Sequence, residues 1–144
     1  MGIVSLSAIK VTQIREIPTP GGNVLHALKG SEDSFQGFGE AYFSWIESGY
    51  IKAWKKHNKM VMNLIVPVGN VKFVFFDSEH NLFSEFIIGE SNYSRITVPS
   101  GLWFGFQGMN SPKNLILNIS SILHDPNEAD RLELSMIKYD WGVV

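Results

Sequence analysis

Short β-favouring runs separated by turn residues repeat along almost the whole chain. The runs are rich in Val, Ile, Phe, Tyr and Trp, and the segments between them contain Gly, Pro, Asn and Ser. The predicted strands are Ile9–Ile17, Val24–Leu28, Phe38–Ile46, Ile51–His57, Met60–Val68, Val71–Asp77, Phe83–Ile88, Ser94–Val98, Trp103–Gly108 and Asn114–Ile119. Many short strands at regular spacing are typical of an antiparallel sandwich or barrel.

Two local patterns predict how the chain turns. Gly69-Asn70 lies between two apolar runs, and glycine readily adopts the positive φ of a tight turn. This pattern predicts a β-hairpin in which Val71–Asp77 pairs with Met60–Val68. Signals for helices are sparse. The one exception is Pro126–Leu132, where one or two helical turns are expected after Asp125 as the N-cap.

The run Met60–Val68 is mainly apolar on both faces of an ideal strand. A strand of this kind is expected to be covered on both sides. A second layer of the fold explains one covered face, and we expect a partner in a homodimer to cover the other. Pro67 cannot donate to the ladder and predicts an edge or a bulge at that point.

Composition excludes several classes of protein. The 144 residues are 44% hydrophobic and 18% charged, which predicts one folded domain spanning residues 1–144. A net charge of −2 gives no global basic field for nucleic acid, and no apolar run reaches the roughly 20 residues of a membrane helix. The absence of cysteine excludes disulfides and thiolate sites and fits a cytoplasmic protein.

A cationic patch precedes the most apolar part of the chain. It consists of Lys52, Lys55, Lys56, His57 and Lys59. Basic side chains held by a rigid sheet are suited to bind an anionic small molecule. The competing interpretation is a solvated edge whose charges prevent strands of different molecules from pairing.

The order of several motifs resembles a known family. The motifs are Gly49–Lys56, Leu64–Asp77, Ile96–Gly108 and Asn114–Pro126, with a weaker match at Gly39–Ser44. Together they cover roughly residues 35–130 and are similar to the dTDP-4-dehydrorhamnose 3,5-epimerase family of the cupin superfamily. The resemblance implies an all-β, cupin-type antiparallel jelly roll with little helix.

The same resemblance implies a metal-free homodimeric epimerase without a cofactor, acting on a nucleotide-linked 4-keto-6-deoxy sugar. In the family a histidine is the base, a lysine stabilises the enolate, and a tyrosine donates a proton on the opposite face. Here Lys55 falls at the base position, Met62 at the lysine, and Phe104 at a further family histidine. Asn118 and His124 fall at the two tyrosines. The scaffold is retained while the acid–base residues differ.

We therefore consider Lys55, His57 and His124 as candidate catalytic residues, because each can transfer a proton near neutral pH. The alternatives are an exposed basic turn for His57 and a local turn bond for His124. The candidate substrate-binding residues are Lys52, Trp54, Asn63, Phe104, Phe106, Asn118 and Glu40. For the aromatic residues the alternative is the core, for the asparagines satisfaction of buried backbone, and for Glu40 the surface.

Histidine spacing argues against a metal site. His26, His57, His80 and His124 are scattered singly, without an H-x-H or H-E-x-x-H pattern.

The favoured function is modification, by epimerisation or isomerisation, of a nucleotide-linked keto-deoxy sugar for cell-surface polysaccharide. The alternative is a non-catalytic cupin that binds a sugar or nucleotide sugar, or an accessory subunit of a sugar enzyme. A third possibility is a structural dimerisation domain with a filled interior.

Overall fold

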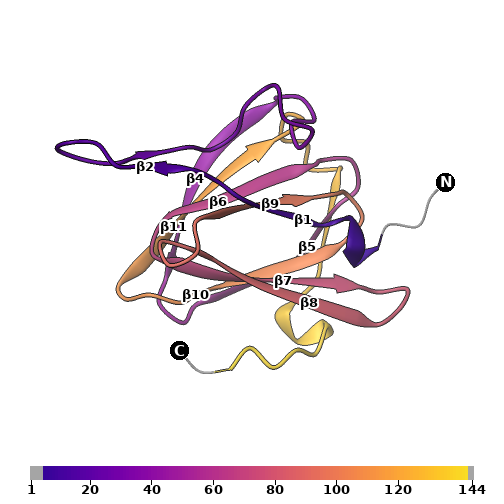
Figure 1. Cartoon of the computed structure of the whole chain (residues 1–144). Coiled ribbons are helices and arrows are strands. Elements are labelled where there is room, and N and C mark those ends of the chain that lie inside the picture. The colour runs from indigo at the N-terminus through magenta and orange to yellow at the C-terminus, as the bar shows by residue number, and fades with distance from the viewer. Residues whose placement is uncertain (1–4, 143–144) are drawn as a thin grey trace.

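A computed structural model describes residues 5–142 and contains two five-stranded sheets packed face to face (Figure 1). The first sheet has the order β1 (Lys10–Gln13), β9 (Ser94–Val98), β6 (Met62–Val68), β11 (Lys113–Ser120) and β4 (Glu40–Glu47). The second has the order β12 (Ala129–Arg131), β5 (Ile51–His57), β10 (Trp103–Gly108), β7 (Asn70–Asp77) and β8 (Leu82–Gly89). A separate ribbon pairs β2 (Glu16–Ile17) with β3 (Val24–Leu25).

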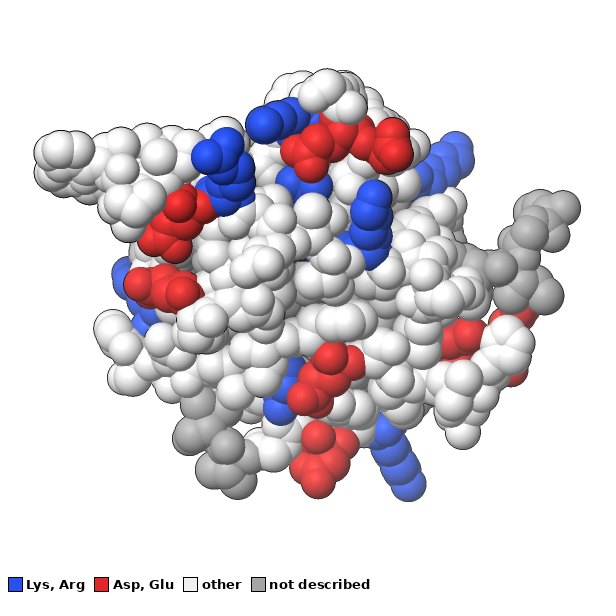
Figure 2. Space-filling view, viewed as in Figure 1, with Lys and Arg blue, Asp and Glu red and all other residues white. Residues whose placement is uncertain are grey.

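Neighbouring strands within each sheet run antiparallel, and the only helices in the described part of the chain are the 3₁₀ turns Leu6–Ala8 and Leu134–Met136. The predicted all-β antiparallel jelly roll is confirmed. No helix within residues 5–142 is long and apolar enough to cross a membrane. On the face seen in Figure 2, acidic and basic side chains are interspersed, and no extended field of one sign forms.

The main core lies between the two sheets. Alternate residues of β6 and β7 point inward, so that Met62, Leu64 and Val66 of the first sheet pack in one buried cluster with Phe73 and Phe75 of the second. This alternation is the usual way in which two packed sheets fill the space between them. These side chains hold the two sheets together.

A second apolar cluster covers the outer face of the second sheet. Trp54 packs there with Val74, Ile137 and Trp141, and its indole Nε1 donates to the carbonyl oxygen of Leu134 at 3.2 Å. The C-terminal segment therefore lies against the outside of this sheet, as Figure 1 shows in yellow.

The predicted hairpin at Gly69-Asn70 is wrong. Gly69 does adopt a positive φ of 77°, but β6 and β7 belong to different sheets. The turn passes from one sheet to the other and is held by distant side chains. Glu90 accepts from the Gly69 amide at 2.6 Å, and Asn114 accepts from the Asn70 amide at 2.9 Å. The turn itself forms as the local pattern indicates, but these tertiary bonds direct the chain into the other sheet.

The predicted helix over Pro126–Leu132 is also wrong. Residues Ala129–Arg131 form β12, which pairs with β5 so that Ala129 lies opposite His57 and Arg131 opposite Lys55. The exposed edge of β5 offers unpaired backbone groups, and pairing with them outweighs a weak helical preference. The predicted first strand Ile9–Ile17 is divided into β1 and β2.

Both faces of β6 are covered, as predicted, and part of the outer cover comes from the same chain. On that face Asn63 donates to the carbonyl oxygen of Ser34 at 3.0 Å. On neighbouring β9, the fully buried Arg95 forms an ion pair with Glu32 at 2.7 Å. The pairing of β6 with β11 shifts in register near Pro67, which confirms the predicted bulge.

Candidate functional site

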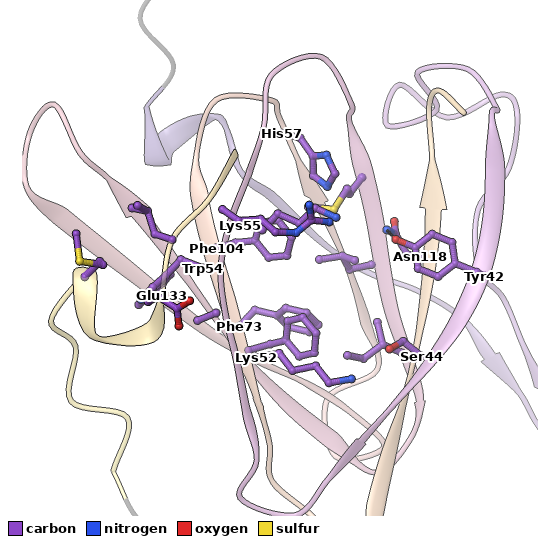
Figure 3. Close-up of a pocket in the computed structure, with 18 residues that line it drawn as sticks. Tyr42, Ser44, Lys52, Trp54, Lys55, His57, Phe73, Phe104, Asn118 and Glu133 are labelled. Carbon is purple, nitrogen blue, oxygen red and sulfur yellow. Dashed lines mark hydrogen bonds between the residues drawn. The ribbon is translucent and has the colours of Figure 1, made fainter. Parts of the chain in front are cut away.

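A cavity of about 740 Å³ lies between the sheets and is open to solvent (Figure 3). Its walls are largely apolar, with a few converging polar side chains, as is typical of small-molecule sites. Seven of the predicted site residues border it: Lys52, Trp54, Lys55, His57, Phe104, Phe106 and Asn118. The indole of Trp54, however, packs in the outer apolar cluster, which matches the core alternative considered for it. The jelly-roll interior is therefore not filled, which is the opposite of what a purely structural domain requires.

Three predicted residues lie elsewhere. Asn63 is buried on the outer face of its sheet, where it binds Ser34 and accepts from Thr97 at 2.6 Å. Glu40 accepts a hydrogen bond from the backbone amide of His124, and the His124 side chain is exposed. Asn63 thus satisfies buried polar groups, which is the alternative considered for it. Glu40 is half-buried, and its bond to the His124 amide joins segments that are distant in the sequence, so it is not the local turn bond considered for His124.

His57 is the polar centre of the cavity wall, and Glu128 lies behind it as its hydrogen-bond partner. His57 is 5% exposed, and its Nδ1 lies 2.7 Å from Oε1 of the equally buried Glu128. The other carboxylate oxygen, Oε2, accepts from the backbone amides of Lys59 at 2.8 Å and Met60 at 2.9 Å. The imidazole also stacks on Phe104, with ring centroids 5.9 Å apart. Both the position and the orientation of the ring are thus fixed.

The protonation of this pair follows from its surroundings. Burial raises the pKa of Glu128, but the hydrogen bonds from His57, Met60 and Lys59 outweigh it and hold that pKa at about 2. Burial lowers the pKa of His57 below its ordinary 6.5, against the opposing effect of Glu128. At neutral pH an ionised carboxylate therefore faces an uncharged imidazole. Nδ1 then donates to Glu128, and Nε2 is left with a lone pair to accept a proton.

Cations surround this pair. Lys55 points into the cavity two residues before His57, and Arg131 lies opposite it on β12. Burial, with a smaller effect from Arg131, lowers the pKa of Lys55, while Glu128 opposes the change. Among residues 5–142, neither Lys55 nor Arg131 forms an ion pair. This side of the cavity can therefore receive an anionic group or an oxygen on which negative charge develops.

Lys52 reaches the same cavity, although it lies an odd number of residues before Lys55. The pairing of β5 with β10 shifts in register between Phe104 and Gly105, so the required irregularity is present. The Lys52 ammonium donates to the carbonyl oxygen of Trp45 at 3.1 Å, near the end of the cavity away from His57 (Figure 3).

The opposite wall is polar as well, and sequence reasoning missed most of it. Tyr42 and Ser44 project inward from β4, and Asn118 projects from β11 (Figure 3). Tyr42, Ser44 and buried Ile46 alternate along β4, which is a period-two signal that could have placed them on one face. Glu128 could not be found in this way, because its segment was expected to be helical.

Comparison with known proteins gives consistent results. No family model matches the chain. The spore coat polysaccharide biosynthesis protein SpsL of Bacillus subtilis (strain 168) is 20% identical in an alignment 146 residues long, which covers 95% of this chain and 97% of that protein. A crystal structure of a dTDP sugar isomerase from Desulfovibrio desulfuricans G20 has a TM-score of 0.89 and 30% identity, and it covers 94% of this chain and 91% of that one.

A more distant structure shares the fold. The dTDP-6-deoxy-D-glucose-3,5-epimerase of Legionella pneumophila Philadelphia 1, in complex with dTDP-4-keto-L-rhamnose, has a TM-score of 0.81 and 13% identity. It covers 98% of this chain and 82% of that one. The jelly roll is therefore common to proteins whose sequences differ widely.

Proposed function

Because the chain belongs to the dTDP-4-dehydrorhamnose 3,5-epimerase-like family of dTDP-sugar epimerases and isomerases, we propose that it epimerises a nucleotide-linked 4-keto-6-deoxy sugar. The observation that carries this proposal is a histidine, His57, which lines an open cavity and is held from behind by the buried carboxylate of Glu128. A nucleotide-sugar modifying role also fits the name of the Bacillus subtilis relative, which acts in polysaccharide biosynthesis. We infer that the product is used for cell-surface polysaccharide.

The chemistry follows from the residues at the cavity wall. A carbon next to a ketone is acidic because the enolate spreads the negative charge onto oxygen. The lone pair on His57 Nε2 can remove that proton, and Glu128 stabilises the imidazolium that forms. Lys55, held beside His57 without a carboxylate partner of its own among the described residues, can stabilise the enolate oxygen.

One observation favours a second candidate, a non-catalytic cupin that binds a nucleotide sugar. Met62 lines the cavity at the position where the family has its enolate-stabilising lysine, and Asn118 lies at one of its tyrosines. A protein that had lost turnover could keep the cations for the diphosphate and lose the remaining catalytic groups. Hydrogen–deuterium exchange next to the ketone separates the two candidates.

The test is proton NMR in D₂O with dTDP-, GDP-, UDP- and CMP-linked 4-keto sugars. An epimerase replaces the hydrogen next to the ketone with deuterium, and the lost signal identifies both the carbon and the nucleotide. Line broadening of one nucleotide sugar without exchange would favour the binding protein. The absence of both effects would contradict any role in nucleotide-sugar chemistry.

The pH dependence of exchange is a sharper expectation. The base must be uncharged, and burial lowers the pKa of His57 below 6.5, so the rate should stay level as the pH falls through 6.5 and decline only below it. In Glu128→Gln the acid limb should move to still lower pH, because the carboxylate raises the pKa of His57. Initial exchange rates between pH 4.5 and 8 measure the acid limb of the native chain and that of Glu128→Gln. A midpoint above 6.5 in the native chain would contradict this assignment of the base.

We also propose that the protein is a homodimer joined through the outer face of β4. This edge strand presents Phe43 and Trp45 to solvent, at 63% and 48% exposure, next to Phe38 at 63%. An aromatic edge strand without protection is a typical site for association. Sedimentation velocity at micromolar concentration should give a dimer, and Phe43→Glu should give a 16.2 kDa monomer. Leu82→Glu, on exposed β8 of the other sheet, is the matched control.

A cytoplasmic location is part of the same proposal. The absence of cysteine from the whole sequence is compatible with the reducing cytoplasm. Loss of one surface sugar in a strain that lacks the protein would support the role proposed for its product, and recovery of the protein in the cytoplasmic fraction of the cells would support this placement.

A further inference from the structure

Tyr42 lines the cavity but takes no part in the proton removal by His57. It projects from β4 of the first sheet, whereas His57 and Lys55 project from β5 of the second. Figure 3 shows Tyr42 and Asn118 on the opposite side of the cavity from His57 and Lys55. A sugar ring bound between the two sheets would therefore have the imidazole on one face and the phenol on the other.

Asn118 controls the orientation of the Tyr42 hydroxyl. The two residues lie directly opposite each other where β11 pairs with β4, and the Asn118 side-chain amide donates to the phenolic oxygen at 2.9 Å. Because the phenolic oxygen accepts this bond, its own proton remains available to another acceptor. A donated hydrogen bond also stabilises the negative charge left on the oxygen when that proton departs.

Asn118 also shows that this side of the site is prepared for a ligand. The residue is only 6% exposed and lines the cavity, yet its Oδ1 has no hydrogen-bond partner. A buried carbonyl oxygen without a partner is costly, and such groups are retained where something else completes them. Because Oδ1 itself has almost no accessible surface, a sugar hydroxyl would supply the missing donor only once the side chain turns toward the cavity on binding.

The position of Tyr42 compensates for the residue at 118. By resemblance, Asn118 falls where the family has a tyrosine, and Tyr42 is the residue paired with it on the next strand. In this chain a phenol therefore lies one strand away from the position that the resemblance gives to the family's tyrosine, and Asn118 at that position donates to the phenolic oxygen. Ser44, on the same face of β4, is a poorer proton donor because an aliphatic alcohol is a weaker acid than a phenol.

We propose that Tyr42 is the catalytic acid of this protein and that Asn118 is its positioning residue. The assignment rests on the proposed function. His57 Nε2 takes the proton from the carbon next to the ketone, and the electron pair of that bond moves onto the ketone oxygen as an enolate. The pair then returns to the carbon, which takes the Tyr42 hydroxyl proton on its other face. The configuration is inverted, and the imidazolium and phenolate exchange their proton difference with water.

The experiment separates removal of the proton from its delivery on the opposite face. Tyr42→Phe is placed in D₂O with the nucleotide-linked keto sugar that the native chain exchanges, and NMR follows deuterium incorporation and the inverted product separately. His57 can still remove a proton and return a deuteron on the same face. We therefore expect washout to stay within a few-fold of native and inversion to fall by about 100-fold or more.

Two further variants complete the test. Tyr50→Phe removes a 59%-exposed phenol outside the cavity and should leave both rates unchanged. Asn118→Leu keeps the branched shape of the side chain but removes the donor, and it should lower the ratio of inversion to washout, which a merely structural role would not change. Thermal unfolding confirms that each variant is folded.

Three results would overturn the assignment. Native inversion by Tyr42→Phe would exclude Tyr42 and leave the proposed function standing. Loss of washout together with inversion in a folded Tyr42→Phe would assign the phenol to substrate binding instead. Absence of washout by the native chain would reject the proposed function, and the role of Tyr42 with it.

Discussion

Replacing His57 with asparagine is expected to slow deuterium exchange next to the ketone by about 10²–10⁴-fold, the usual contribution of a positioned general base. Asparagine can still donate to Glu128 and nearly fills the space of the ring, but it has no basic nitrogen. Binding of the nucleotide sugar should be retained, because the cations Lys52, Lys55 and Arg131 stay in place. NMR exchange rates and line broadening measure the two quantities in the same sample.

The chain offers a matched control for this variant. His80 is also paired with a carboxylate, since its Nδ1 lies 2.6 Å from Asp77, but it is on an exposed turn outside the cavity. His80→Asn should exchange at the native rate. Exchange at the native rate by His57→Asn would instead point to Lys55, which occupies the family's base position, and Lys55→Ala would then be the inactive variant.

Replacing Asn114 with alanine is expected to destabilise the fold by about 3–5 kcal/mol, because each buried polar group left without a partner costs about 1–3 kcal/mol. Asn114 is fully buried, and its side chain accepts from the amides of Asn70 and Asn110 and donates to the carbonyl oxygens of Ile46 and Asn110. These bonds join the turn that carries the chain between the two sheets. Thermal denaturation should show a Tm lowered by roughly 10–15 °C.

The control for this variant is Asn127→Ala. Asn127 is exposed, and its side chain makes no hydrogen bond within residues 5–142. Its free energy of unfolding should change by no more than about 0.5 kcal/mol. Equal stability of Asn114→Ala and Asn127→Ala would contradict the role given to the inter-sheet turn.

Strand positions could be predicted from the sequence because they depend on local composition and period. Ile51–His57, Ser94–Val98 and Trp103–Gly108 match at both ends. Strand partners could not be predicted in the same way. The Gly69-Asn70 signal correctly gives a tight turn, but whether the next strand returns to the same sheet depends on bonds to Glu90 and Asn114, which are distant in the sequence.

The site shows the same division between local and distant information. The basic run on β5 predicted Lys52, Lys55 and His57 at the cavity, and the family resemblance predicted Asn118. Glu128 was missed because it acts only when β12 pairs with β5. A helix over Pro126–Leu132 would not pair with β5, so the wrong prediction for this segment gave no reason to place Glu128 beside His57.

The attachment of β12 at the edge of its sheet has a consequence for how the protein becomes active. His57 is made early, whereas the carboxylate that orients it belongs to Glu128, which immediately precedes β12, the last strand among residues 5–142. During synthesis the earlier strands can fold first. The imidazole acquires its defined tautomer only after Glu128 has docked. For the proposed epimerase, competence would therefore follow the docking of Glu128, and a nascent chain that ends before this residue carries His57 without its carboxylate partner.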